Sequence, residues 1–87
     1  MVLKLFKYYV DVITMISRDG LLTPLTMIWK ERKYPIEKVT EVRETYSRAG
    51  GSGIRYTCQF RGQSRNLFWE RNRWFIESEI FEPGQND

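Results

Sequence analysis

Apolar and polar residues alternate along residues 54–77, and this alternation predicts three antiparallel strands. We place one two-residue turn at Gly62-Gln63 and the next at Arg71-Asn72. Opposed residues then point to the same face, with Tyr56 opposite Trp69 and Arg55 opposite Glu70. The predicted core face carries Ile54, Tyr56, Cys58, Leu67, Trp69, Trp74 and Ile76.

The opposite face of this predicted sheet combines aromatic and basic residues. Phe68 and Phe75 are directly opposed there, with arginines around them. Such a face can stack bases and hold phosphates, or it can bind a protein partner. Alternatively, both rings pack beneath the N-terminal segment or a second subunit, because large apolar groups of a small domain are mostly buried. The candidate partner-binding face consists of Arg55, Thr57, Gln59, Arg61, Asn66, Phe68, Arg73 and Phe75.

The first thirty residues predict a hairpin. Tyr8–Ser17 is rich in β-branched residues, which favours a strand, although its apolar residues also recur at helical spacing and leave a short helix as the alternative. Arg18-Asp19-Gly20 is a turn, because Asp-Gly supports the positive φ of a tight hairpin. Leu22–Lys30 is the second strand, and Pro24 indicates an edge or a bulge at its start.

The middle of the chain predicts a charged loop and a further strand. Lys30–Lys33 is expected to be a solvated loop. Within Ile36–Ser47 we favour a strand over Val39–Ser47, and a helix is the alternative. Gly50–Gly53 leads directly into a strand and is therefore expected to be a hairpin connection, since a phosphate-binding loop would lead into a helix.

These elements predict an all-β fold, a small antiparallel barrel of five or six strands, SH3-like or OB-like in size. We expect residues 1–79 to form a single domain and residues 80–87 to form a flexible acidic tail. An aromatic content of 15% gives this short chain of 87 residues a dense core.

Composition argues against most enzyme classes. The chain has no histidine, which excludes Ser-His-Asp and Cys-His catalysis and imidazole metal sites. Cys58 is the single cysteine and is expected to be a buried, inert thiol, compatible with a cytoplasmic protein. We expect no cofactor, no metal and no membrane partner. The net charge of +3 is modest, and Glu70 lies among six arginines between residues 48 and 73.

Several short stretches combine aromatic residues with a basic-Tyr turn: Pro24–Trp29, Lys33–Val39, Gly53–Tyr56, Leu67–Trp69 and Arg73–Phe75. Together they resemble a family of small bacterial proteins of unknown function that are predicted β-barrels. The resemblance covers about two-thirds of the chain and concerns aromatic core positions. It implies a bacterial origin and a barrel-like fold, and it brings no catalytic or ligand-binding residues.

The sequence therefore predicts a non-catalytic binding module. The favoured partner is another protein or a second copy, bound through Phe68 and Phe75 or through a free strand edge. The alternative is a barrel that binds single-stranded nucleic acid with its arginines and aromatic rings. The modest basicity and the position of Glu70 favour the protein partner.

Overall fold

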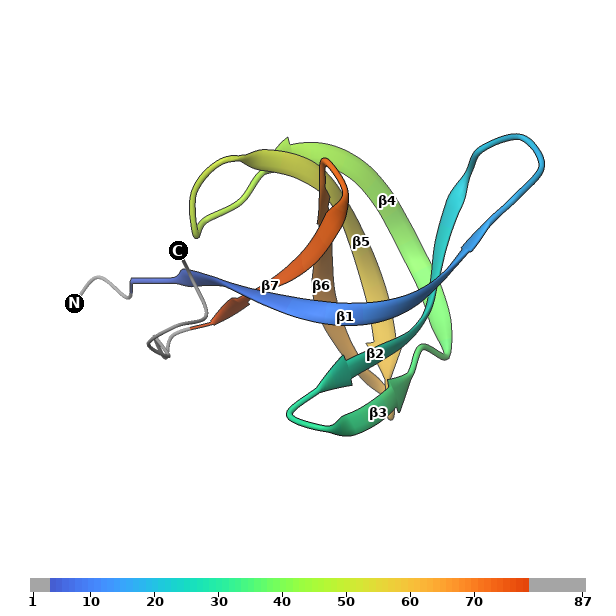
Figure 1. Ribbon diagram of the computed structural model, residues 1–87. Coiled ribbons are helices and arrows are strands. Elements are labelled where there is room, and N and C mark those ends of the chain that lie inside the picture. The colour runs from blue at the N-terminus through green and yellow to red at the C-terminus, as the bar shows by residue number, and fades with distance from the viewer. Residues whose placement is uncertain (1–3, 79–87) are drawn as a thin grey trace.

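The computed structural model describes residues 4–78, which form one antiparallel sheet and contain no helix. The predicted acidic tail, residues 80–87, lies outside the described residues. Figure 1 shows that the sheet is curled into a barrel-like shape. Its strands lie in the order β3-β2-β1-β7-β6-β5-β4. The strands are β1 (Phe6–Ile16), β2 (Leu22–Trp29), β3 (Arg32–Pro35), β4 (Lys38–Tyr46), β5 (Ser52–Phe60), β6 (Gln63–Glu70) and β7 (Arg73–Ser78).

The all-β, barrel-like prediction is confirmed, but the strand count is not. The sheet has seven strands instead of five or six, so the SH3-like or OB-like size class does not describe it. The extra strand is β3, which occupies part of the predicted charged loop. The turn before it needs only Lys30 and Glu31, whose φ angles of 50° and 64° reverse the chain within two residues.

The two ambiguous segments are both strands. Residues 6–16 form β1 and residues 38–46 form β4, so neither helix alternative holds. β1 is shared between two partners, because residues 6–10 pair with β7 and residues 11–16 pair with β2. The register of β1 on β2 shifts after Ile13, where Thr14 pairs with Pro24. Pro24 therefore lies at a bulge, as its missing N–H predicts.

The faces of the C-terminal meander are as predicted, but one turn is not. The β6–β7 turn lies at Arg71-Asn72, and Trp69 pairs with Trp74. The β5–β6 turn lies at Arg61-Gly62 instead of Gly62-Gln63, because both Arg61 (φ 50°) and Gly62 (φ 78°) adopt positive φ.

This displaced turn shifts the β5–β6 pairing by two residues. Tyr56 consequently pairs with Leu67 instead of Trp69, and Arg55 pairs with Phe68 instead of Glu70. A shift of two residues keeps each side chain on its face. The predicted core residues accordingly all belong to, or pack against, the central core cluster.

Two residues join the opposite edges of the curled sheet. The chain leaves β3 at Pro35 and enters β4 at Lys38. Between them, Ile36 N–H donates to the carbonyl of Leu25 on β2, and Glu37 N–H donates to the carbonyl of Gln59 on β5. This link holds β2 and β5 close together at one end of the molecule.

The core is closed by two hydrogen bonds that cross it. The Tyr56 hydroxyl donates to the Leu22 carbonyl (3.1 Å), and Trp74 Nε1 donates to Thr14 Oγ1 (3.0 Å). The Trp74 ring lies between those of Tyr56 and Trp69, at centroid distances of 5.1 and 5.0 Å. The predicted register, with Tyr56 opposite Trp69 and Trp69 opposite Trp74, places Trp69 in the middle; instead Trp74 is the residue that brings β5, β6 and β7 together.

Trp74 supplies the first test. Trp74 is 4% exposed, and Trp74→Ala should lower the free energy of unfolding by about 3–5 kcal/mol, as expected for removal of a buried ring. Tyr46→Ala is the control, because Tyr46 is 83% exposed and its loss should change stability by less than about 0.5 kcal/mol. Urea titration measures both, and equal midpoints would show that Trp74 is not a core residue.

Candidate functional site

The predicted partner-binding face is found on the convex side of the sheet, but its aromatic centre is buried. Phe68 and Phe75 stack with a centroid distance of 5.0 Å and are only 2% and 0% exposed. Tyr9 packs edge-on against Phe75, and the Lys7 ammonium lies 5.0 Å from the centroid of the same ring. The alternative interpretation of packed rings therefore holds, because both rings are buried and side chains of the N-terminal strand β1 pack against Phe75.

The arginines of this face are engaged within the chain. Arg55 forms an ion pair with Glu41 (2.6 Å), and Arg73 lies 3.9 Å from the centroid of the Tyr9 ring. Arg61 lies in the β5–β6 turn, over Tyr34. Among the polar members, the Thr57 hydroxyl donates to Asn66 Oδ1, and the backbone carbonyl of Gln59 accepts a hydrogen bond from Glu37 N–H. Partner binding by this face stays a prediction, and the buried rings are not available to it.

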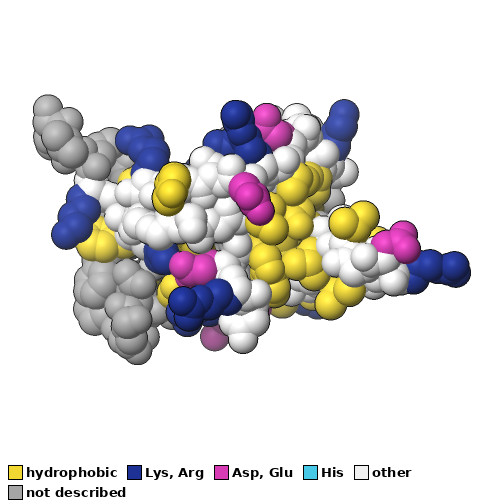
Figure 2. Space-filling model, turned by 90° about the horizontal axis from the view of Figure 1, so that it is seen from above, with side chains coloured by type: hydrophobic (Ala, Val, Ile, Leu, Met, Phe, Trp, Pro, Cys, Tyr) yellow, Lys and Arg dark blue, Asp and Glu magenta, His cyan; other side chains and the backbone are white. Residues whose placement is uncertain are grey.

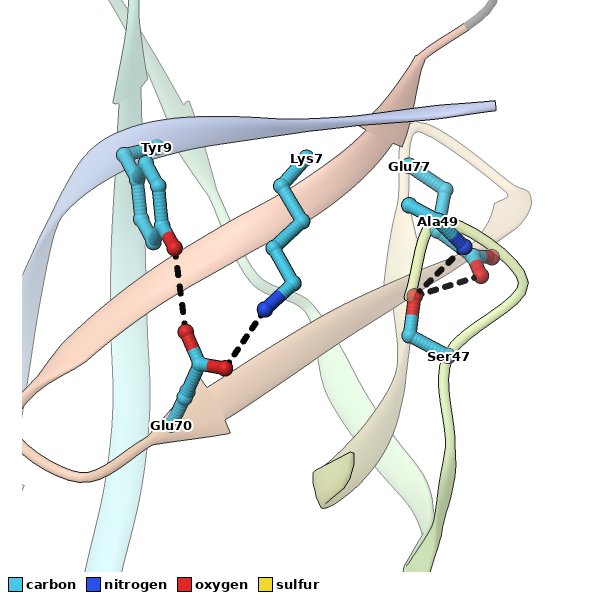
Figure 3. A network of polar contacts seen from close by, with 6 residues as sticks. All are labelled: Lys7, Tyr9, Ser47, Ala49, Glu70 and Glu77. Atoms are coloured by element: carbon cyan, nitrogen blue, oxygen red, sulfur yellow. Dashed lines mark hydrogen bonds and ion pairs between the residues drawn. The ribbon is translucent and has the colours of Figure 1, made fainter. Parts of the chain in front are cut away.

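A polar network that the sequence does not predict joins Lys7, Tyr9 and Glu70 (Figure 3), and its first two members also contact the buried Phe75 ring. Lys7 Nζ donates to Glu70 Oε2 (2.6 Å), and the Tyr9 hydroxyl donates to Glu70 Oε1 (3.0 Å). The hydrogen bond from Lys7 is the main reason that the pKa of Glu70 is lowered. The pKa of Tyr9 is raised, first by burial and then by its bond to Glu70. Glu70 is thus held as a carboxylate, which suits an ion pair better than proton transfer.

A second carboxylate fastens the loop between β4 and β5. Glu77 Oε2 accepts from Ser47 Oγ (2.9 Å) and from Arg48 N–H (2.6 Å), and Ala49 N–H donates to Ser47 Oγ (Figure 3). Glu77 pairs with Lys7 across β1 and β7, so the loop is attached where these strands meet. The two carboxylates therefore stabilise the fold.

The Glu70 ion pair makes a pH-dependent prediction. Lys7→Met should lower the free energy of unfolding by about 1–3 kcal/mol near pH 7, because Glu70 loses its charged donor. Because the pKa of Glu70 is lowered in the folded state, the stabilisation is fully present at pH values above the ordinary carboxylate pKa. The stabilisation is lost as the pH falls through the lowered pKa of the folded state. Wild type and variant should then converge in acid.

Urea titrations at several pH values measure this effect. Lys33→Met is the control, because Lys33 is exposed and makes no ion pair with any described residue. If Lys7→Met lowers the free energy of unfolding by the same amount at neutral and acid pH, the assigned role of Glu70 is contradicted.

Cys58 is buried, as predicted, and its thiol is poorly ionised. The side chain is fully buried, and burial raises the pKa of the Cys58 thiol to about 11. Since the thiolate is the nucleophile, this residue is unsuited to covalent catalysis. Among residues 4–78, no group of three or more acidic, histidine or cysteine residues is arranged to hold a metal ion.

The reactivity of Cys58 is testable with a thiol reagent. Fewer than about one in a thousand folded molecules should expose the thiol at any moment, given ordinary domain stability. Reaction with a colorimetric disulfide reagent should therefore be at least about a hundredfold slower in buffer than in urea. Similar rates in the two conditions would show that Cys58 is accessible.

A concave pocket of about 750 Å³ opens at the end of the barrel where the β5–β6 turn lies. Its apolar part includes Trp29 and Leu67, and Trp29 Nε1 is buried without a hydrogen-bond partner among the described residues. The arginines on its rim are engaged, because Arg65 bonds Gln63 and Arg61 lies over Tyr34. The pocket therefore offers apolar contact more than a charged anchor.

Most of the exposed large hydrophobic side chains among residues 4–78 belong to the β1–β2 hairpin. We call residues 13–25 the arm; it projects away from the rest of the sheet in Figure 1. A band of apolar side chains extends onto it in Figure 2. The turn at its tip is formed within the chain, since Ser17 bonds Gly20 and Leu21. Its exposed apolar side chains are Ile13, Met15, Ile16, Leu21 and Leu25.

Both faces of the arm are apolar. Ile16 shares a face with Thr14, which contacts Trp74, whereas Ile13 and Met15 point the other way. Ile16 and Leu21 are 67% and 69% exposed, so the core does not reach the end of the hairpin. Sequence reasoning missed this surface, because β-branched and aliphatic residues in a strand indicate a core.

Comparison with protein-family models, with curated proteins and with solved structures finds no match. The resemblance to small bacterial barrel proteins therefore stays a prediction. No helix among residues 4–78 is long and apolar enough to cross a membrane.

Proposed function

We propose that this chain is a non-catalytic module that binds another protein through the arm. The observation that carries the proposal is the placement of exposed apolar side chains. Five of the seven exposed large hydrophobic residues among the described part of the chain lie between Ile13 and Leu25. Exposed apolar patches on small soluble proteins mark interaction sites.

The shape of the arm supports insertion into a partner. The hairpin is anchored to the rest of the sheet at two points, because Trp74 Nε1 donates to Thr14 Oγ1 and the Tyr56 hydroxyl donates to the Leu22 carbonyl. These anchors fix its direction and reduce the entropy lost on binding. Because apolar side chains occupy both faces, the fitting partner is a groove that encloses the hairpin.

The catalytic alternative has little support. The pKa of Cys58 is raised by burial, the carboxylate of Glu70 is neutralised by Lys7, and the chain has no histidine. A cytoplasmic location is part of the proposal, since a lone free thiol suits a reducing compartment.

The nucleic-acid alternative loses the stacking surface on which it was based. Phe68 and Phe75 are buried, and Arg55 and Arg73 already contact Glu41 and Tyr9. A strand of bases would need accessible rings and free cations. We therefore favour a protein partner, and the capture experiment below also detects nucleic acid if that is what binds.

The test is affinity capture from a bacterial extract, with quantitative mass spectrometry. Ile16→Ser combined with Leu21→Ser should reduce capture of the specific partner at least about tenfold, because the arm loses its most exposed apolar side chains. The fold should persist, since exposed substitutions change stability by about 0.5 kcal/mol or less each.

The matched control is Tyr46→Ser, which removes an exposed apolar side chain outside the arm and should leave capture unchanged. Equal capture by wild type and arm variant would overturn the proposal. The proposal would also be overturned if nuclease removed the bound material and if its binding weakened steeply with salt, because that behaviour identifies nucleic acid.

A further inference from the structure

Strand β4 is an edge strand with a row of exposed side chains. It lies at one end of the sheet order and pairs with β5, while its other edge faces no described strand. Glu41, Val42, Arg43 and Glu44 are all exposed. An open edge of this length is a template for pairing with another strand, unless charge or irregularity prevents it.

The charges on the convex side of β4 are unbalanced within the chain. Arg43 pairs directly with Arg55 across β4 and β5, and like charges in this position are destabilising. Glu41 compensates Arg55 through its ion pair of 2.6 Å. Arg43 has no acidic partner within 4 Å among the described residues. An acid supplied opposite Arg43 would remove the imbalance.

A second copy of β4 can supply that acid in one register. Two identical edges related by a two-fold axis normal to the sheet pair antiparallel, and their convex faces stay on the same side. Centring the axis on Arg43 opposes two arginines, and centring it on Glu41 or Glu44 opposes two glutamates. Centring it on Val42 opposes Arg43 to Glu41 of the partner subunit, twice.

We propose that this protein forms a two-fold homodimer by antiparallel pairing of β4 edges, centred on Val42. Each Arg43 then lies opposite Glu41 of the partner subunit. The two Val42 side chains, which are exposed in the isolated chain, meet on the concave side. The proposal goes beyond the proposed function of the arm, and it identifies the partner of this edge as a second copy.

The competing interpretation is that β4 is a protected edge. Its pairing with β5 shifts between Val39 and Glu41, and bulges and charges both discourage edge pairing. The shift lies at the start of the strand, and Glu41–Tyr46 pairs regularly with β5 after it. A protected edge predicts a monomer at all concentrations, so the two interpretations differ in a measurable quantity.

Sedimentation velocity measures this quantity from about 1 µM to several hundred µM, the range of ordinary transient affinities. Wild type should dimerise, and Arg43→Glu should weaken the dimer at least about tenfold by opposing two carboxylates. Combining Glu41→Arg with Arg43→Glu should restore dimerisation, because the ion pairs are exchanged in place. Arg65→Glu, an equal charge change on the exposed part of β6, should have no effect.

A monomeric wild type, or a dimer that Arg43→Glu leaves unchanged, would overturn the proposal. Failure of the double exchange to restore a dimer lost in Arg43→Glu would overturn the register. If Arg43→Glu unfolds by circular dichroism, Val42→Lys supplies the same test with two opposed ammonium groups. A monomer that still captures its partner through the arm rejects only the dimer, and a dimer without arm-dependent capture rejects only the proposed function.

Discussion

The curled sheet depends on the packing and the hydrogen bond of the Trp74 indole. Its ring packs against Tyr56 and Trp69, its backbone pairs with Val10, and its N–H bonds Thr14. One side chain therefore contacts β1, β5 and β6 from its place on β7. The arm projects from the part of β1 that this bond holds, so a buried core residue orients the exposed apolar hairpin.

The core face was predictable because alternation assigns every strand residue to a side. The β5–β6 turn was not, because moving it from Gly62-Gln63 to Arg61-Gly62 leaves every residue on the same side. Strand β3 was missed for a different reason. It is short and begins with the charged residues Arg32 and Lys33, and the turn before it uses Lys30 and Glu31, which carry no glycine or asparagine signal.

The candidate sites were less predictable, because they depend on distant parts of the chain. Phe75 packs against Lys7 and Tyr9, which lie more than sixty residues earlier in the sequence. No local pattern reports that contact. The arm presents the opposite case. Ile16 and Leu21 have the composition of a core strand, and only the length of β1 beyond the core leaves them exposed.

The sheet order has a consequence for how the chain folds. Within the described sheet, β1–β7 is the one pairing that joins strands not consecutive in the sequence. β1–β3 and β4–β7 are thus two local meanders, connected by Ile36 and Glu37. Each can form with little loop-closure entropy, and we expect their docking along β1 and β7 to be the slower step. The chain is accordingly divisible at residues 36–37 into two segments, each a continuous set of hairpins, and β1–β7 is the strand pairing that joins them.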